Sequence, residues 1–189
     1  MSMGLNALTR ELHANERPQL LTHLLALDAQ DRHLRFGHVL SDDGVRHYVE
    51  GIDWVHDAVF VVTDTDLAII GAAHLVQEDS HAELGISVSP QSRGQGIGGA
   101  LLARCAARAR NWGMRVMFMN CLVENAAMMH LARKQGLKIA VSGAEAEAFV
   151  RLPRPDLTSL AAEAVAEQIG LFDHAQKSYW LGAQARLPR

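Results

Sequence analysis

Residues 89–100 read SPQSRGQGIGGA, and this stretch decides the fold. It follows an alternating segment, 82–88 (AELGISV), that predicts a β-strand, and it leads into a segment of helical character, 97–112. The four glycines allow the backbone to bend tightly, and the start of a helix presents free N–H groups that favour an anion. The sequence therefore predicts a cradle for a phosphorylated cofactor.

Two common phosphate loops do not fit this stretch. A P-loop ends in Lys followed by Ser or Thr, and no such pair closes the run. Gly94, Gly96 and Gly99 do have the spacing of a dinucleotide fingerprint. That fingerprint starts directly after its strand and needs an acid near the end of the next strand. Here residues 89–93 intervene, and the next predicted strand, 116–121 (VMFMNC), has no acid.

The loop resembles instead the acyl-CoA loop of the GNAT N-acetyltransferase superfamily, which has Gln or Arg, two residues, Gly, one residue, then Gly or Ala. Gln91, Gly94 and Gly96 match this pattern. A second block, 125–137 (NAAMMHLARKQGL), resembles the second cofactor motif of the family. The resemblance covers roughly residues 32–152 and says little about the acceptor.

The resemblance implies an α/β (α+β) fold, with a central mixed, mostly antiparallel sheet that is flanked by helices and splayed at the acyl-CoA site. It also implies an N-acyltransferase that moves an acetyl group from acetyl-CoA (coenzyme A) to a primary amine by direct attack. The amine acceptor, a small molecule or a protein, stays open. The alternative comes from another class of protein: a non-catalytic acyl-CoA-binding sensory or regulatory module.

The resemblance assigns roles to individual residues. Glu83 is the candidate general base, directly or through water, and the other interpretation is a solvated edge-strand acid. The main chain of 86–88 would bind the pantetheine arm and polarise the thioester carbonyl. Asn125 would bind that arm, cap its own helix, or do both. The candidate cofactor-binding residues are Ile86, Val88, Gln91, Arg93, Gly94, Gln95, Gly96, Ile97, Gly98, Gly99, Asn125 and Met128.

One departure from the family concerns the leaving thiolate. Seven residues beyond the motif Asn the family commonly has a Tyr that protonates this group, and this chain has Ala132. A thiol with a pKa of about 8.5 is a tolerable leaving group, so the loss need not abolish turnover. His130 lies about 200° around a helix from position 132, so we do not expect it to take over the role.

Composition and charge limit the possible partners. The chain has 189 residues, 49% of them hydrophobic, and a formal net charge of −3, which argues against general nucleic-acid binding. No apolar stretch is long enough to span a membrane and no signal peptide is apparent, so we expect a cytoplasmic protein without a membrane partner. No Cys and His cluster has the spacing of a zinc site, so we expect no metal.

The charges are unevenly distributed, because no acid occurs between Glu83 and Glu124. We expect the arginines in this interval to create a positive field around the glycine loop, although Arg108 and Arg110 also suit a solvated helix face. The arginines concerned are Arg93, Arg104, Arg108, Arg110 and Arg115.

Hydrophobic periodicity places the other elements. Residues 18–27 predict a helix, and 28–36 predict a short turn that leads into an extended piece. Ser41 is expected to cap a helix over 42–50. Further strands are predicted over 58–63, 67–74, 137–141 and 146–152, and helices over 97–112 and from Asn125.

We predict two units: a GNAT-like acetyltransferase domain over 1–155 and a C-terminal helical extension over 156–189. Apolar residues recur at helical spacing in the extension, and Gly170 is expected to break its helix. Phe172, Tyr179, Trp180 and Leu181 form an apolar group too large to leave in water. The extension should therefore dock on its own domain or on the partner subunit of a homodimer.

Overall fold

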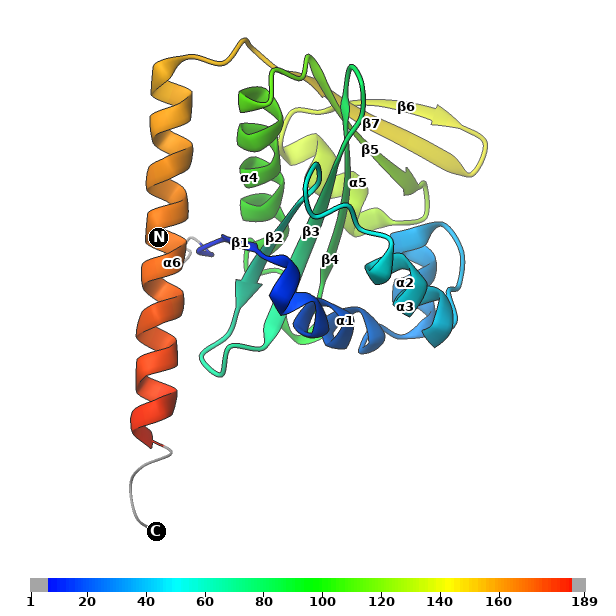
Figure 1. The fold of residues 1–189 in the computed structure, drawn as a ribbon. Coiled ribbons are helices and arrows are strands. Elements are labelled where there is room, and N and C mark those ends of the chain that lie inside the picture. Colours follow the sequence, from blue (N-terminus) through cyan, green and yellow to red (C-terminus); the bar gives the residue numbers. More distant parts are fainter. Residues whose placement is uncertain (1–6, 185–189) are drawn as a thin grey trace.

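The computed structural model describes residues 7–184 and shows a seven-stranded sheet with helices on both faces (Figure 1). The strands are β1 (Arg10–Leu12), β2 (Ala58–Thr63), β3 (Ile69–Gln77), β4 (Ala82–Val88), β5 (Val116–Leu122), β6 (Lys138–Ser142) and β7 (Glu145–Arg151). The helices are α1 (Arg17–Leu25), α2 (Ala29–Phe36), α3 (Asp42–Glu50), α4 (Ile97–Asn111), α5 (Ala126–Lys134) and α6 (Leu157–Gln184), with 3₁₀ turns at Ala14–Glu16 and Pro90–Ser92.

The strands lie in the order β1-β2-β3-β4-β5-β7-β6. The β4–β5 pair is parallel, and the other neighbouring pairs are antiparallel. The predicted mixed, mostly antiparallel α/β (α+β) sheet is therefore confirmed. The two predicted units extend into residues 1–6 and 185–189, which lie outside the described part of the chain.

Strand alternation divides the core into two layers. On β2, Phe60 points to the face that α4 covers, where it is fully buried. Its neighbours Val59 and Val61 point to the opposite face and pack with residues of α1 and α3. On β4, Leu84 and Ile86 belong to the α4 layer, so Glu83, Gly85 and Ser87 face the side of α1 to α3.

The parallel pairing of β4 and β5 ends after two residue pairs in the described chain, Ala82 with Met117 and Glu83 with Phe118. β4 continues to pair with β3 as far as Val88. The two central strands therefore part beyond Glu83, and the predicted splay of the sheet is confirmed.

The prediction for 28–36 is wrong, because these residues form α2 and no extended piece. Asp28 caps the helix by accepting a hydrogen bond from the Asp31 N–H at 2.7 Å. Gly37 ends it in the left-handed conformation, with φ of 79°. The capping Asp28 and the terminating Gly37 thus define a helix, although the sequence between them is short and mostly polar.

The prediction that Gly170 breaks the C-terminal helix is also wrong, because α6 runs without interruption from Leu157 to Gln184. Gly170 lies against β1 instead. A Cβ at this position would stand 2.2 Å from the Thr9 carbonyl oxygen. The missing side chain thus lets the helix approach the strand, and this contact outweighs the low helix propensity of glycine.

α6 docks on its own chain through charged side chains. The Arg104 guanidinium contacts Glu167 at 2.8 Å and Glu163 at 3.3 Å, and the Arg104 side chain is only 3% exposed. Arg108 pairs with both Glu163 and Glu11. Burial alone would lower the pKa of Arg108, but its hydrogen bonds with Glu11 and Glu163 raise that pKa above its usual value.

These ion pairs correct the expectation of a positive field around the glycine loop. Arg104 and Arg108 face α6, where Glu163 and Glu167 neutralise them. Arg110 pairs with Asp156, which precedes α6. Among the arginines of this interval, Arg93 lies at the loop.

The face of α6 that points away from the domain is apolar, and its large side chains remain mostly exposed on the described part of the chain. Phe172 and Tyr179 are each 72% exposed, and Trp180 is 58% exposed. The exposed residues of this face are Leu157, Leu160, Ala161, Ala164, Val165, Gln168, Ile169, Phe172, Ala175, Gln176, Tyr179 and Trp180. None of them carries a charge. In Figure 1 the helix stands at the edge of the molecule beside α4 and β1.

We predict that Gly170→Ala lowers the free energy of unfolding by about 1 to 3 kcal/mol, because the added methyl group must displace β1. Chemical denaturation would measure this loss. Gly182→Ala is the matched control, since no atom lies within 4 Å of a Cβ there, and it should be neutral or slightly stabilising. Equal effects of the two substitutions would contradict this account of Gly170.

Candidate active site

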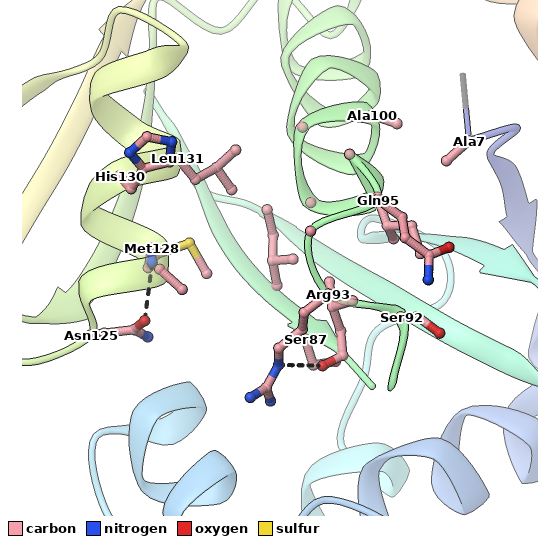
Figure 2. A pocket seen from close by; sticks show the side chains of 18 of the residues that line it. Ala7, Ser87, Ser92, Arg93, Gln95, Ala100, Asn125, Met128, His130 and Leu131 are labelled. Atoms are coloured by element: carbon pink, nitrogen blue, oxygen red, sulfur yellow. Dashed lines mark hydrogen bonds between the residues drawn. The ribbon is translucent and has the colours of Figure 1, made fainter. Parts of the chain in front are cut away.

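A cavity of about 770 Å³ lies between the end of β4, the start of α4 and the first turns of α5 (Figure 2). Residues 86–88 of β4 and residues 92–100 of the loop and helix form one side of it. Side chains of α5 form the opposite side, and α2 contributes Asp31, Leu34 and Arg35. The cavity therefore occupies the region where β4 has left β5.

The glycine loop presents the N-terminus of α4 to this cavity. Gly96 is the N-cap in the left-handed conformation, with φ of 84°, and within the described chain no side chain caps the helix. The first helical hydrogen bond joins the Ala100 N–H to the Gly96 carbonyl at 3.0 Å. The N–H groups of residues 97–99 are thus left for an anion, and the helix dipole adds to the attraction.

Eleven of the twelve predicted cofactor-binding residues line the cavity. They are Ile86, Val88, Arg93, Gly94, Gln95, Gly96, Ile97, Gly98, Gly99, Asn125 and Met128. Gln91 is exposed in the 3₁₀ turn outside the lining, and its carbonyl accepts a hydrogen bond from the Gln95 amide at 3.3 Å.

Asn125 and Arg93 hold the rim of the cavity together. Asn125 Oδ1 accepts from the Met128 N–H at 3.0 Å, which is the predicted helix cap (Figure 2). Its Nδ2 donates to the Leu34 carbonyl at 3.4 Å. Arg93 donates from Nε to the Val88 carbonyl at 3.2 Å and from Nη2 to Asp31 at 2.6 Å. These contacts join the loop and α5 to α2.

Glu83 lies on the other side of the sheet from α4, at the last residue pair before the split. It is exposed, it is outside the cavity lining, and one carboxylate oxygen accepts from the Asn120 amide at 3.0 Å. Gly85, Ser87 and Glu83 share one face of β4, so the carboxylate lies along the strand that leads into the cavity.

The chain matches the model of the Acetyltransferase (GNAT) family over residues 22–137, more than half its length. It belongs to the GNAT family. A comparison with curated protein sequences gives no match.

Solved structures share the GNAT fold at low sequence identity. The GNAT domain of S. lividans PAT is 19% identical with a TM-score of 0.66, and the match covers 76% of this chain and 89% of that one. Spermidine N-acetyltransferase from Vibrio cholerae, in complex with CoA and spermine, is 18% identical (TM-score 0.60, 76% and 94% covered). YncA of Salmonella typhimurium, a putative acetyltransferase with acetyl-CoA, is 19% identical (TM-score 0.58, 79% and 97% covered).

Residues 7–184 of this GNAT protein include no helix that is both long and apolar enough to cross a membrane. In the same residues, no three His, Cys, Asp or Glu side chains are grouped to hold a metal ion.

The position of the missing GNAT tyrosine is buried. Ala132 is fully buried in the core cluster, and its methyl side chain has no proton to donate. His130 does line the cavity, as Figure 2 shows, on a different side of α5 from Ala132.

Sequence reasoning missed a buried histidine beside the cavity. His23 of α1 contacts the Ile69 carbonyl through Nδ1 at 3.0 Å and the Ser87 hydroxyl through Nε2 at 2.9 Å. Nδ1 must donate to the carbonyl, so Nε2 accepts from Ser87. Burial lowers the pKa of His23 to about 4, and the nearby Arg35 charge adds to this effect. The ring is therefore neutral at pH 7 and ties α1 to β3 and β4.

Sequence reasoning also missed the contribution of α2, because 28–36 had been predicted as a turn and an extended piece. One signal was available. Gly85 interrupts the predicted strand, and a glycine inside a strand often marks a close approach by another group. That group is Arg35 of α2.

We predict that His23 makes stability fall as the pH is lowered from 6.5 to about 4. The folded protein keeps His23 neutral while the unfolded chain binds a proton, so the favourable contribution present above pH 6.5 is lost in this window, by up to about 3 kcal/mol. Denaturant unfolding of the wild type and of His23→Gln across this range is the measurement. The stability difference between them should shrink as the pH falls, and a constant difference would contradict the assignment.

Proposed function

We propose that this GNAT protein is an N-acetyltransferase that moves an acetyl group from acetyl-CoA to a primary amine. One observation carries the proposal: a single cavity joins the free N-terminus of α4 to the split between β4 and β5. Acetyl-CoA supplies the acetyl group as an activated thioester. A cofactor with a diphosphate and an amide-rich arm needs both parts of this cavity: the helix N-terminus for the diphosphate and the split between the strands for the arm.

The cavity fits the two ends of such a cofactor. The N–H groups of residues 97–99 suit the diphosphate, for which the dipole of α4 adds attraction. Residues Ile86 to Val88 keep β3 as a neighbour on one side, and within residues 7–184 no strand pairs with them on the other. Main-chain groups on that open side suit the pantetheine arm and the thioester carbonyl. Met128 and Leu131 of α5 provide apolar contact opposite.

Glu83 is our candidate for the general base. An amine must lose a proton before or as it attacks, and a carboxylate beside the split can accept this proton directly or through water. The Asn120 amide orients Glu83 by its hydrogen bond to one oxygen. The second oxygen is left for the acceptor. The competing interpretation, a solvated acid at the surface, agrees with the exposure of Glu83.

The buried Ala132 favours a second candidate function, a non-catalytic acyl-CoA-binding sensory or regulatory module. Such a module would keep the cavity without needing a proton donor for the thiolate. We favour the enzyme, because a thiolate leaves without assistance more readily than most groups and because Glu83 is retained. We also propose a cytoplasmic protein with a small-molecule or protein acceptor and no nucleic-acid partner, in keeping with its net charge of −3.

We predict that Glu83→Gln lowers turnover about 100-fold or more while leaving acetyl-CoA affinity unchanged, because the amide keeps the shape of the side chain but cannot accept the proton. Calorimetry would measure cofactor binding, and thiol release with a pool of amines would measure turnover. Glu78→Gln, at an exposed glutamate in the β3–β4 turn, is the matched control.

The outcomes separate the candidate functions. Cofactor binding with amine-dependent thiol release supports the enzyme. Binding without release from any amine supports the sensory module. Absence of binding contradicts both, and unchanged turnover in Glu83→Gln contradicts the role of Glu83 alone.

We also propose that the protein is a homodimer in which two copies of α6 pack through their outer faces. The face is apolar and uncharged over a helix of 28 residues, which is about 42 Å long. An uncharged face is self-complementary, because two copies meet without opposing like charges, and a two-fold dimer requires such a face. A partner of opposite charge would have no charge to recognise there.

We predict that the wild type has twice the mass of one chain in sedimentation experiments and that Phe172→Glu is a monomer, because two glutamates would be buried near the centre of the interface. Val55→Glu, at an apolar residue that is 85% exposed and distant from α6 in sequence, is the control and should remain a dimer. A monomeric wild type would contradict the proposal.

A further inference from the structure

The guanidinium group of Arg35 lies flat on the backbone of β4 at Gly85. A Cβ on Gly85 would stand 2.3 Å from each of Cζ, Nη1 and Nη2 of Arg35, so all three atoms cover this position equally closely. Any side chain at residue 85 would displace the group. Arg35 also lines the cavity, beside the split between β4 and β5. It lies on the same side of the sheet as Glu83.

Aromatic and polar neighbours hold Arg35 in this position. The guanidinium lies 4.9 Å from the centre of the Phe36 ring and 5.6 Å from that of Tyr48. Nη2 donates to the Tyr48 hydroxyl at 2.9 Å, and the hydroxyl in turn donates to His74 Nδ1 at 2.8 Å. His74 Nε2 then donates to Asp57 at 3.0 Å. This chain fixes the plane of the guanidinium and leaves its other N–H groups free of Tyr48.

The charge of Arg35 has no carboxylate partner among the ion pairs of residues 7–184. Asp57 is the acid at the end of the chain, and Tyr48 and His74 separate it from Arg35. The nearby Arg93 is different, because Asp31 neutralises it at 2.6 Å.

His23 and His74, two buried histidines on this face, add no positive charge at pH 7. Burial lowers the pKa of His23 to about 4, and burial also lowers the pKa of His74 despite its contact with Asp57. Among residues 7–184, Arg35 is therefore a cation on this side of the cavity that has no carboxylate partner. Glu83 lies two residues from Gly85 on the same strand face, so the two strand positions are about 7 Å apart along β4.

We infer that Arg35 binds a carboxylate of the substrate. The inference rests on the proposed acetyl transfer, and it names the chemical class of the reactants. A planar guanidinium with free N–H groups matches a carboxylate in two parallel hydrogen bonds, and its fixed orientation reduces the entropy cost of binding. A purely cationic acceptor such as a polyamine would meet an unfavourable charge at this point.

Two sources carry a carboxylate to this position. The first is the acceptor: an amino acid would place its amine toward Glu83 and its carboxylate on Arg35. The second is the acyl chain of a dicarboxylic acyl-CoA, whose terminal carboxylate would extend past the thioester. The charge pattern across Gly85 favours the first source, because it provides one site for each charge of an amino acid.

Matched substrate pairs test the inference. In the acceptor arm, each of the twenty amino acids is compared with its primary amide, using acetyl-CoA. In the acyl arm, succinyl-CoA is compared with butyryl-CoA, using one amine. We expect kcat/KM for the carboxylate member to exceed that of its neutral partner about 10- to 100-fold in the acceptor arm, mainly through KM. The same preference in the acyl arm alone would assign the carboxylate to the acyl chain.

Arg35→Gln should reduce the preference to about one, and Arg35→Lys should keep only part of it, because lysine retains the charge but loses the planar pair of donors. Arg46→Gln, at an exposed arginine of α3 outside the cavity, is the control and should keep the full preference. The wild-type preference and Arg35→Lys remain informative if Arg35→Gln does not fold.

Failure of the inference differs from failure of the proposed function. Equal kcat/KM within the pairs of both arms overturns the inference while transfer stands, and so does a preference that survives in Arg35→Gln. If neither these pairs nor the pool of amines supports thiol release, the transfer proposal fails. Calorimetry with the same pairs then decides the inference. It is supported if the carboxylate member of a pair binds more tightly than its neutral partner and if Arg35→Gln removes this difference. Equal binding of the two members overturns it.

Discussion

The candidate active site depends on the early end of the pairing between β4 and β5. Parallel strands in a sheet normally stay together, yet these two share only the pairs at Ala82 and Glu83 within the described chain. β3 holds β4 on its other side, so β4 keeps its shape after β5 has left. The opened wedge faces the N-terminus of α4 and leaves backbone groups of β4 without a strand partner in the described chain. Glu83 marks the point of separation, and Gly85, on which Arg35 packs, is the next residue on its face.

α6 reverses the usual arrangement of an amphipathic helix. Charged side chains point inward, where the carboxylates of Glu163 and Glu167 meet the buried Arg104. Buried charges are stable only when they are paired, so removing one partner of this network would leave the others uncompensated. Apolar residues consequently occupy the outer face, where a surface helix usually has polar ones. A second apolar surface that covers this face would explain the pattern.

Local signals in the sequence predicted much of the fold and of the cavity. Alternation over 82–88 gave the bounds of β4, and the asparagine before residue 126 correctly indicated a cap, because both signals act within a few residues. The errors arose where distant residues decide. Arg104 and Arg108 looked like a positive field because their acidic partners lie more than fifty residues away in the sequence. Gly170 looked like a helix break because the contact that requires a glycine there, the approach of the Thr9 carbonyl, comes from the other end of the chain. Arg35 gave no local signal, and only the glycine fifty residues away hinted at a contact.

The two faces of β4 divide recognition between them. Leu84 and Ile86 belong to the α4 layer, which supports the glycine loop and the cavity proposed for the cofactor. Gly85 and Ser87 face α1 and α2, which bring Arg35 and His23. The period of two in a strand thus directs neighbouring side chains of β4 into two different layers. The layers meet at the cavity, where Arg93 of the loop pairs with Asp31 of α2. Under the proposed transfer, the side of β4 that faces α1 to α3, where Arg35 packs on Gly85, is therefore the part of the fold that would recognise the charge of the acceptor.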